Sequence, residues 1–371
     1  MKTLIITLEY PPQIGGIASF VYNLASHLPP EQTVVWAPSI INGQGFDAKN
    51  LWKTYRGTPY YSFFWPRWLK LYWQIKKIIK QEGIQQIYVQ HALPVGYVAK
   101  MIKRMFKIPY TIFFHGTDVE LGTKFKKNKL ENVCLSADTI IMNSQSLAKK
   151  LAERLRKLDL NKIKVVNPCP ADFFFTRCPA EEINKLKSEL ALNGRKVILT
   201  VARLDEGKGY PHLLHLLPEV LNKVSNAVLV IIGDGPKRKQ ILEQIQKENL
   251  QNSVRFLGDI PYQNLPAYFQ LADIFVLLTH KDEGREESWG TAFLEAAASG
   301  LPVVAGKAGG IEEVVENLKT GIIVDVYQPQ GIISTIIDLL HQPDFARQMG
   351  AAGQKRVQEQ FTWDQQLKKL I

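Results

Sequence analysis

Short apolar segments alternate with longer amphipathic segments along the whole chain, and this alternation limits the folds that the sequence can adopt. Parallel strands need crossover connections, usually helices, and such sheets are covered by helices on both faces. One series of this kind occupies the first half of the chain and a second series the other half. The sequence therefore predicts an α/β protein with two doubly wound, Rossmann-like domains, and its 371 residues suit two cores better than one.

The two series define the expected elements. In the first half the strands are Thr3–Leu8, Thr33–Ala37, Gln86–Gln90, Thr111–His115, Thr139–Asn143 and Lys164–Asn167, and the helices are Gly16–His27, Pro66–Glu82, Val95–Phe106 and Ser144–Arg156. In the second half the strands are Lys196–Val201, Ala227–Gly233, Val254–Leu257, Ile274–Leu278, Pro302–Ala305 and Ile322–Val324, and the helices are Tyr210–Lys223, Lys237–Glu248, Leu265–Leu271, Thr291–Ser299 and Ile311–Asn317. The segment Cys169–Asn193 is expected to link domains of residues 1–170 and 190–360, and a final helix, 364–371, is expected to pack back on the first domain.

The composition is that of a soluble globular protein, with 46% hydrophobic and 22% charged residues. No apolar run approaches the ~18 residues of a membrane span. The first strand is followed at once by Glu9 and two prolines, and it is too short for the apolar region of a secretory signal. We therefore expect a cytoplasmic protein. The spacing of Cys134, Cys169 and Cys178 fits neither a disulfide framework nor a zinc site, which indicates buried or incidental thiols.

The net charge of +11 is unevenly distributed. The first 170 residues hold about 24 basic residues against about 10 acidic ones, so the excess positive charge lies in this half. The segment 52–80 contains no acidic residue, and its lysines and arginines are interleaved with aromatic residues. Two interpretations fit this pattern: contact with an anionic membrane surface, or a solvated basic face with aromatic side chains in the core. No nucleic-acid-binding motif is present.

Glycines and polar residues follow several expected strands, and ligands of doubly wound sheets bind at the carboxyl ends of the strands. Gly15 and Gly16 precede the first helix, where backbone N–H groups can approach a phosphate, although a plain strand–helix turn would look the same. His115 ends a strand and precedes a glycine, which fits a structural role as well as a functional one. With two such sheets, the cleft between the domains is the expected site.

In the second half, Arg203 and Lys208 flank a turn after the first strand. Two cations at this position could neutralise a diphosphate leaving group, and a solvated turn is the alternative. Gly233 and Asp234 follow the next strand, in a turn that permits a phosphate or a nucleotide. Ile260 ends a segment that could present its backbone to a base.

The strongest functional signal is the pair Glu287 and Glu295, eight positions apart. The first is expected in a loop above the carboxyl end of the sheet and the second one or two turns deeper in a helix, so a nucleotide sugar is long enough to contact both. The residues between them could offer backbone N–H groups to hydroxyls or a phosphate at the start of that helix. These residues are Ser288, Trp289, Gly290 and Thr291.

This set of motifs, in this order, resembles the retaining glycosyltransferases of the GT-B fold, specifically glycosyltransferase family 4, and the resemblance covers nearly the whole chain. It rests on Glu-Tyr-Pro-Pro…Gly-Gly at 9–16, His-Gly at 115–116, Arg203 with Lys208, Gly-Asp-Gly-Pro at 233–236 and Glu-x7-Glu at 287–295. The charged stretch 281–286 is similar to a longer loop of the bacterial phosphatidylinositol-mannoside mannosyltransferases, which favours GDP-mannose over UDP sugars. The resemblance implies two domains that face each other across a cleft.

The resemblance also implies roles for the matching residues. Gly16 would place its amide on the donor diphosphate, His115 would contact the donor sugar, and Arg203 with Lys208 would hold the leaving diphosphate. The two glutamates would bind hydroxyl groups and not act as an acid and a base.

In the implied reaction, Glu287 holds the donor sugar and Glu295 the ribose. The anomeric configuration is retained by front-face substitution. A double displacement needs a carboxylate on the opposite face of the sugar, and the sequence identifies none. No cofactor and no metal are expected, because no Asp-x-Asp motif appears where a metal-dependent transferase would carry one.

The implied enzyme transfers a hexose from a nucleotide sugar to a glycan or glycolipid acceptor, and a peripheral place at the inner face of the plasma membrane would suit a lipid-linked acceptor. Three alternatives stay open: a soluble acceptor with a UDP-sugar donor, a nucleotide-sugar epimerase, and a binding module that has lost catalysis. Turnover without an acceptor would indicate the epimerase. An intact cellular function after Glu287→Ala would indicate the binding module. No nucleic-acid partner is expected.

Overall fold

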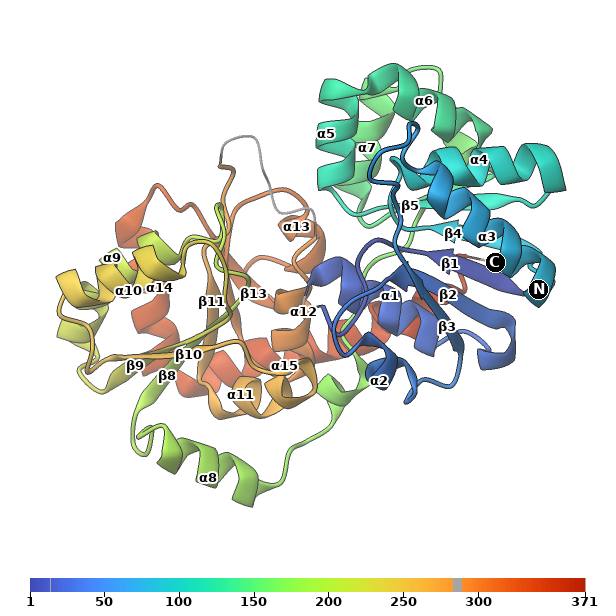
Figure 1. Cartoon of the computed structure of the whole chain (residues 1–371). Helices are drawn as coiled ribbons and strands as arrows, with labels where there is room; N and C mark the ends of the chain where they lie inside the picture. Colours follow the sequence, from blue (N-terminus) through green and yellow to red (C-terminus); the bar gives the residue numbers. More distant parts are fainter. Residues whose placement is uncertain (14, 283–288, 371) are drawn as a thin grey trace. The chain divides into compact units, whose positions relative to one another are not determined.

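The computed structural model describes residues 1–13, 15–282 and 289–370, which form two compact units (Figure 1). Unit 1 comprises Met1–Pro168 together with Trp363–Ile371, and unit 2 comprises Cys169–Thr362. Each unit contains one parallel sheet. The predicted α/β class with two doubly wound domains is therefore confirmed.

The described strands of unit 1 form a seven-stranded sheet in the order β3-β2-β1-β4-β5-β6-β7. They are β1 (Thr3–Ile6), β2 (Thr33–Pro38), β3 (Lys53–Gly57), β4 (Gln86–Val89), β5 (Tyr110–Phe114), β6 (Thr139–Met142) and β7 (Ile163–Val165). The helices are α1 (Gly16–Ser26), α2 (Gly43–Asp47), α3 (Leu69–Glu82), α4 (Val95–Phe106), α5 (Thr117–Phe125), α6 (Lys127–Ser136), α7 (Gln145–Arg154) and α16 (Trp363–Leu367). The direction of winding reverses between β1 and β4, so the crevice at their carboxyl ends is the topological switch point.

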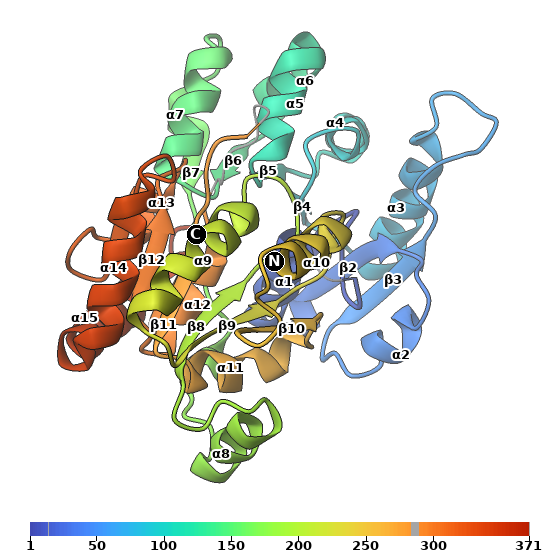
Figure 2. The ribbon, with the colours of Figure 1, turned by 90° about the vertical axis from the view of Figure 1, so that its left-hand side faces the viewer.

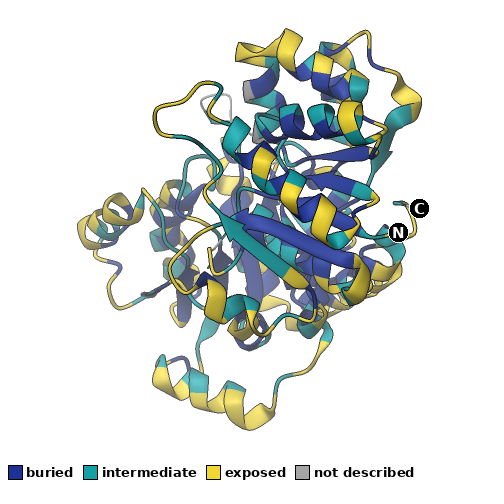
Figure 3. Ribbon diagram, turned by 45° about the vertical axis from the view of Figure 1, so that its right-hand side comes forward, coloured by how far each residue is buried: buried dark blue, intermediate teal, exposed yellow. Residues whose placement is uncertain are grey.

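Different helices cover the two faces of this sheet. On one face, alternate side chains of the strands pack with α3, α4, α6 and α7 in one apolar cluster. On the other face, the ring centroid of Phe113 in β5 lies 6.1 Å from that of Phe20 in α1, and Phe20 lies 5.4 Å from Trp363 in α16. Figure 3 shows the strands as mostly buried and the outer faces of the helices as exposed. The last helix of the chain is therefore part of the core of unit 1.

The described strands of unit 2 form a six-stranded parallel sheet in the order β10-β9-β8-β11-β12-β13. They are β8 (Lys196–Val201), β9 (Ala227–Ile232), β10 (Val254–Gly258), β11 (Ile274–Leu277), β12 (Val303–Gly306) and β13 (Gly321–Val324). The helices are α8 (Ala180–Glu189), α9 (Tyr210–Lys223), α10 (Arg238–Lys247), α11 (Leu265–Leu271), α12 (Thr291–Ala298), α13 (Ile311–Val314), α14 (Pro329–His341) and α15 (Pro343–Gln360). Here the switch point lies between β8 and β11.

The sheet of unit 2 is also covered on both faces. Helices α9, α10, α14 and α15 pack on one face, and Figure 2 shows α9 and α10 in front of β8 and β9. On the other face Phe275 of β11 contacts Phe269 of α11 and Phe293 of α12, with ring centroids 5.5 and 5.7 Å apart. Helix α12 is thereby fixed against the centre of the sheet.

Two differences from the predicted elements have clear physical reasons. Strand β3 is not predicted, because it lies at the edge of the sheet and none of its residues is fully buried, so it lacks a continuous apolar run. The segment Cys169–Asn193 is more than a connection, because it contains α8 and belongs to unit 2. Helices α2, α5, α6, α14 and α15 are also absent from the predicted elements. Most of the remaining elements have bounds within a few residues of the predicted ones.

Candidate active site

Three loops at the carboxyl ends of neighbouring strands interlock in unit 2. The Leu204 N–H donates to the Asp234 carbonyl at 3.0 Å, and the Lys237 N–H donates to the Leu204 carbonyl at 3.0 Å, which joins the loops after β8 and β9. The His280 N–H donates to the Gly207 carbonyl at 3.0 Å, which joins the loops after β8 and β11. These bonds fix the main chain at the switch point, so the backbone that carries the side chains of the β8 loop is held in place.

Glycine is required where these loops approach each other. Gly209 has a φ of +72°, and a Cβ on it would lie 2.1 Å from the Leu278 carbonyl oxygen. Gly233 has a φ of +134°, and a Cβ on it would lie 2.0 Å from the Ala202 carbonyl oxygen. A side chain fits at neither position. Gly233 therefore has a packing role, whether or not its turn also contacts a phosphate.

Arg203 and Lys208 both lie on the loop after β8. The Arg203 side chain is 66% exposed, and its Nε lies 3.5 Å from Asp205 Oδ2; Lys208 is half-buried. The Tyr210 hydroxyl donates to the Ala202 carbonyl at 2.8 Å and so ties the start of this loop to its end. An exposed guanidinium on a fixed backbone at a switch point can bind an anionic group such as a diphosphate.

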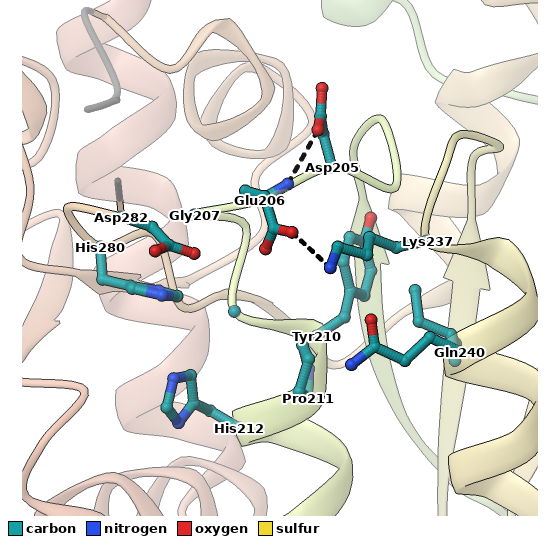
Figure 4. A pocket seen from close by; sticks show the side chains of 12 residues that line it. Asp205, Glu206, Gly207, Tyr210, Pro211, His212, Lys237, Gln240, His280 and Asp282 are labelled. Atoms are coloured by element: carbon teal, nitrogen blue, oxygen red, sulfur yellow. Dashed lines mark hydrogen bonds and ion pairs between the residues drawn. The ribbon is translucent and has the colours of Figure 1, made fainter. Parts of the chain in front are cut away.

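A pocket opens beside the same loop (Figure 4). On one side of it, Glu206 forms an ion pair with Lys237. On the other side, the rings of His212 and His280 meet edge to face with centroids 4.9 Å apart. Burial lowers the pKa of the His212 imidazole and the nearby His280 lowers it further, whereas Asp282 acts in the opposite direction. The Glu206–Lys237 ion pair thus lines one side of the pocket, and two imidazole rings line the other.

The Asp234 carboxylate stabilises its own turn. It accepts the Gly235 N–H at 2.7 Å and an Arg238 N–H at 2.5 Å. These bonds, the backbone one first, hold the pKa of the Asp234 carboxyl below its usual range. The Arg238 guanidinium lies 5.1 Å from the centre of the Phe256 ring. Because its carboxylate is engaged in this way, the backbone of the turn is the part of Asp234 best suited to contact a ligand.

Glu295 is buried on α12 and has a tyrosine partner. The Tyr262 hydroxyl donates to Glu295 Oε1 at 2.8 Å. Tyr262 begins a 3₁₀ turn (Tyr262–Asn264) two residues after Ile260, which is itself half-buried. Burial raises the pKa of the Glu295 carboxyl to about 7, and the bond from Tyr262 acts in the opposite direction. A carboxyl group whose pKa is about 7 is partly protonated at neutral pH, so it can donate or accept a hydrogen bond, as hydroxyl recognition requires.

The start of α12 places three of the predicted donor-site residues together. Gly290 precedes the helix with a φ of +81°, and Thr291 is its first residue. The Trp289 indole is buried and contacts Phe361, with ring centroids 5.5 Å apart, so this ring belongs to the core. A ligand at this helix N-terminus would therefore contact the Trp289 backbone rather than its side chain.

Glu287 and Ser288 lie outside the described residues. Their predicted contacts with a donor sugar stay predictions, and so does the span from Glu287 to Glu295. The structure describes the deeper end of that span, because Glu295 is anchored on α12 beside Tyr262.

In unit 1, Gly16 is the first residue of α1. A Cβ on Gly16 would meet no described atom within 4 Å, so packing does not require glycine there. The Gly15 carbonyl accepts the Ser19 N–H at 3.0 Å and so closes the first helical turn. The N-terminus of a helix suits an anion.

His115 lies at the end of β5 in a mainly apolar setting. Its Nε2 lies 3.1 Å from Gln90 Oε1, and its ring meets Phe20 edge to face at 5.1 Å. Burial lowers the pKa of the imidazole to about 3, and the charge of His91 acts in the same direction. The Asp118 carboxylate accepts the His115 backbone N–H at 3.2 Å and fixes the turn. A neutral imidazole held in this way suits a sugar hydroxyl better than an anion.

Sequence reasoning misses two pairs that the structure brings together. Tyr262 bonds Glu295, and Glu9 faces His91 at 3.6 Å. The signal that could have revealed them is the same in each case. Tyr262, Glu9 and His91 follow β10, β1 and β4 within four residues of the strand end, near the carboxyl edge where ligands bind, although this position does not identify their partners.

The described residues also bear on metal, membrane and thiol chemistry. Within residues 1–13, 15–282 and 289–370, no group of three or more His, Cys, Asp or Glu side chains is placed to hold a metal ion. None of the described helices is long and apolar enough to cross a membrane. Cys134 and Cys169 are buried and Cys178 is half-buried, and no disulfide joins these three residues.

Two family models match the chain. The model for Glycosyltransferase Family 4 matches residues 14–169, and the model for Glycosyl transferases group 1 matches residues 182–356. Together they cover most of unit 1 and unit 2. The chain belongs to glycosyltransferase family 4. The predicted family and the predicted enzyme class are thereby confirmed.

Relatives with assigned functions match along much of this transferase. It is 26% identical to the GDP-mannose-dependent alpha-(1-6)-phosphatidylinositol monomannoside mannosyltransferase of Mycobacterium tuberculosis, over 100% of this chain and 97% of the relative. It is 27% identical to the N-acetyl-alpha-D-glucosaminyl L-malate synthase of Bacillus anthracis, over 78% of this chain and 74% of the relative. The crystal structure of Anabaena Alr3699/HepE in complex with UDP-glucose superposes with a TM-score of 0.84 at 20% identity, covering 100% of this chain and 99% of that one. This likeness shows the GT-B fold.

Proposed function

We propose that this transferase moves a hexose, with mannose as the first choice, from a nucleotide sugar to a hydroxyl group of a glycan or glycolipid acceptor. The observation that carries the proposal is the interlocked loop that presents Arg203 and Lys208 at the switch point of unit 2. Cations on a fixed backbone stabilise the charge that develops on a departing nucleoside diphosphate. The mannose and glycolipid parts rest on the mycobacterial relative.

The proposed reaction retains the anomeric configuration. The acceptor oxygen bonds to the anomeric carbon on the face from which the diphosphate leaves, and a leaving-phosphate oxygen takes the acceptor proton. Arg203 and Lys208 hold that phosphate, and Glu295 with Tyr262 holds the ribose. The neutral His115 imidazole binds a sugar hydroxyl. Because cationic side chains and helix N-termini can neutralise the diphosphate, the proposal includes neither a metal nor a cofactor.

A thermal-shift panel with GDP, UDP and ADP, followed by their sugars, tests the donor. We expect GDP and GDP-mannose to raise the melting temperature most. A ligand at about 100 times its Kd stabilises the folded state by about 2.7 kcal/mol, which gives a measurable shift. Transfer of mannose from GDP-mannose to phosphatidylinositol monomannoside, followed by mass spectrometry and NMR of the new anomeric centre, tests the acceptor and the retention. Equal rates with and without EDTA are expected. No shift with any of the three nucleotides would contradict the proposal.

A second candidate is transfer from a UDP sugar to a soluble acceptor. It is favoured by the name of the Bacillus anthracis relative, an N-acetylglucosaminyl L-malate synthase, and by the Anabaena structure with UDP-glucose. The same panel separates the two candidates, because a larger shift with UDP than with GDP would select the second. UDP-N-acetylglucosamine with L-malate is then the first pair to assay.

We further propose that the loop between β3 and α3 contacts an anionic membrane surface. Phe63 is fully exposed, Trp65 is 83% exposed, and Phe64 and Trp73 are exposed as well. Figure 2 shows this loop as a blue segment that extends away from α3. Lys76 lies 4.9 Å from the centre of the Trp73 ring, so cations accompany the aromatic side chains. Such a mixture suits the headgroup region of an anionic bilayer.

Co-sedimentation with vesicles tests the membrane contact. Binding to phosphatidylcholine vesicles that contain phosphatidylglycerol should exceed binding to pure phosphatidylcholine. The double substitution Phe63→Ser with Trp65→Ser should remove most of it. Phe345→Ser is the matched control, because Phe345 is an exposed aromatic residue on α15 of unit 2. Equal binding to neutral and anionic vesicles would reject this part of the proposal.

A further inference from the structure

The switch point of unit 1 carries polar side chains to which the proposed function gives no role. Glu9 follows β1, His91 follows β4, and β1 and β4 are the paired strands at which the winding direction reverses. Ligands of doubly wound sheets bind in this crevice. In unit 2 the equivalent crevice, between β8 and β11, carries the Arg203–Lys208 loop. The crevice of unit 1 is thus a second candidate binding site with different side chains.

The side chains of Glu9 and His91 face each other across this crevice. His91 Nε2 lies 3.6 Å from Glu9 Oε1, which is longer than a direct hydrogen bond, and the two side chains are 16% and 35% exposed. The Leu8 backbone N–H donates to His91 Nδ1 at 3.3 Å. Because Nδ1 accepts this bond, Nε2 is the ring nitrogen that carries a proton and can donate it.

A hydroxyl group fits this pair of atoms. An oxygen placed about 2.8 Å from both His91 Nε2 and Glu9 Oε1 can accept the imidazole N–H and donate its own proton to the carboxylate. The Glu9 backbone is held for this purpose, because Thr7 Oγ1 accepts the Glu9 N–H at 3.1 Å and donates to the Glu9 carbonyl at 2.7 Å. A phosphate would meet the negative charge of Glu9, so the pair selects a neutral ligand.

Two neighbouring features indicate how such a ligand would lie. A Cβ on Gly15 would be 3.5 Å from Glu9 Oε2, which places the carboxylate beside the start of α1. Gln90, next to His91 in sequence, is fully buried, and its Nε2 has no hydrogen-bond partner among the described residues. Buried donors are rarely left unpaired. Gln90 directly follows β4, so this unpaired donor lies at the same strand end as His91.

We propose that Glu9 and His91 bind a hydroxyl group of a neutral polyhydroxylated molecule, a sugar or a cyclitol, and so select the acceptor of the transferase. That this molecule is the acceptor substrate rests on the proposed function. Binding of a polyol at the switch point of unit 1 does not depend on it and can be tested separately.

The test is binding of methyl α-D-mannopyranoside and of myo-inositol to the full chain, measured by saturation-transfer NMR and titration. Glu9→Ala should weaken binding about tenfold or more, the scale of losing a hydrogen bond to a charged group. His91→Asn keeps an acceptor near Nδ1 for the Leu8 N–H but removes Nε2, and it should weaken binding similarly. His91→Gln returns a donor near the Nε2 position and should bind within about threefold of wild type. Melting temperatures show that each variant is folded.

The inference is overturned if neither polyol binds the wild-type chain, if Glu9→Ala binds as well as wild type, or if the Asn and Gln variants of His91 bind equally. A merely structural role for His91 would predict that last result. The thermal-shift panel with nucleotides tests the proposed function independently of polyol binding. A wild-type chain that binds a polyol through Glu9 but responds to no nucleotide would contradict the proposed function and leave the polyol site standing.

Discussion

The two sheets have equivalent switch points, but their side chains and backbones differ. In unit 2 three loops interlock through backbone bonds, Gly209 and Gly233 leave no space for a side chain, and the loop presents Arg203 and Lys208. In unit 1 a Cβ on Gly16 would meet no described atom within 4 Å, and the polar groups nearby are carboxylates, an amide and imidazoles. The unit 2 loop is fixed by backbone bonds and presents two cations, whereas the unit 1 crevice presents Glu9 and His91.

This difference matches the two chemical tasks of a glycosyl transfer. A departing diphosphate gains charge in the transition state, and preorganised cations stabilise that charge only if the backbone that carries them does not move. A hydroxyl acceptor is neutral and needs matched donors and acceptors rather than net charge. The excess positive charge of the first half lies partly in the segment 52–80, which carries the exposed aromatic loop.

The rigidity of unit 2 is tested most severely by Gly209→Ala. A Cβ there would lie 2.1 Å from a backbone oxygen at a φ of +72°, so strain and overlap together should lower the free energy of unfolding by about 4 kcal/mol. The counterpart in unit 1 is Gly16→Ala, which should stay within about 0.5 kcal/mol of wild type because its Cβ meets open space. Calorimetric unfolding of both variants is the measurement. Equal losses would remove the contrast between the two crevices.

Glu295 should make unit 2 less stable as the pH rises. Its pKa in the folded chain is about 7 against 4.5 for the ordinary group. Below pH 4.5 the carboxyl is protonated in both states and its contribution is complete. As the pH rises through 7, the unfolded state has already ionised and the contribution is lost, by about 3 kcal/mol in total.

Glu295→Gln isolates this effect, because glutamine stays neutral at every pH. Denaturation at pH 5 and pH 8 should show the variant close to wild type at the lower pH and clearly more stable at the higher one. The Asp118 carboxyl in unit 1, whose pKa burial raises to about 6, adds a loss of the same sign in both proteins and does not disturb the comparison. Parallel pH profiles would show that Glu295 is already paired as an anion.

The cationic character of the unit 2 crevice is tested by Arg203→Ala and Lys208→Ala. Each should lower turnover of the nucleotide sugar by about 10²-fold, or about 2.7 kcal/mol of transition-state stabilisation. Lys239→Ala is the matched control, because Lys239 lies on α10 of the same unit and is 89% exposed beside Glu243. It should leave the rate unchanged. Turnover near wild type in either loop variant would exclude that side chain from the leaving-group site.

The sequence predicts the sheets well because strands buried on both faces are continuous apolar runs that end abruptly. It also places Arg203 and Lys208 after β8. The loop after β8 lies at the switch point because β8 and β11 are the neighbouring strands at which the order reverses. It cannot pair Tyr262 with Glu295 or Glu9 with His91, because those partners are distant in the chain and no local period records them. The aromatic residues of the segment 52–80 differ in burial: Tyr72 is in the core, whereas Phe63 is exposed.

The smallest expected effect concerns the Tyr262 hydroxyl. Tyr262→Phe removes the donor that lies 2.8 Å from Glu295 Oε1, so the variant should lose about 1 kcal/mol at pH 5. At pH 8 the bond is charge-assisted and the loss should be larger. Because the bond favours the ionised carboxyl, its loss raises the pKa of Glu295 and moves the fall in stability to higher pH. In the double variant with Glu295→Gln this shift should vanish. If the single variant keeps the wild-type pH profile, the tyrosine packs beside α12 without tuning the carboxyl, and the ribose-binding role assigned to the pair would rest on Glu295 alone.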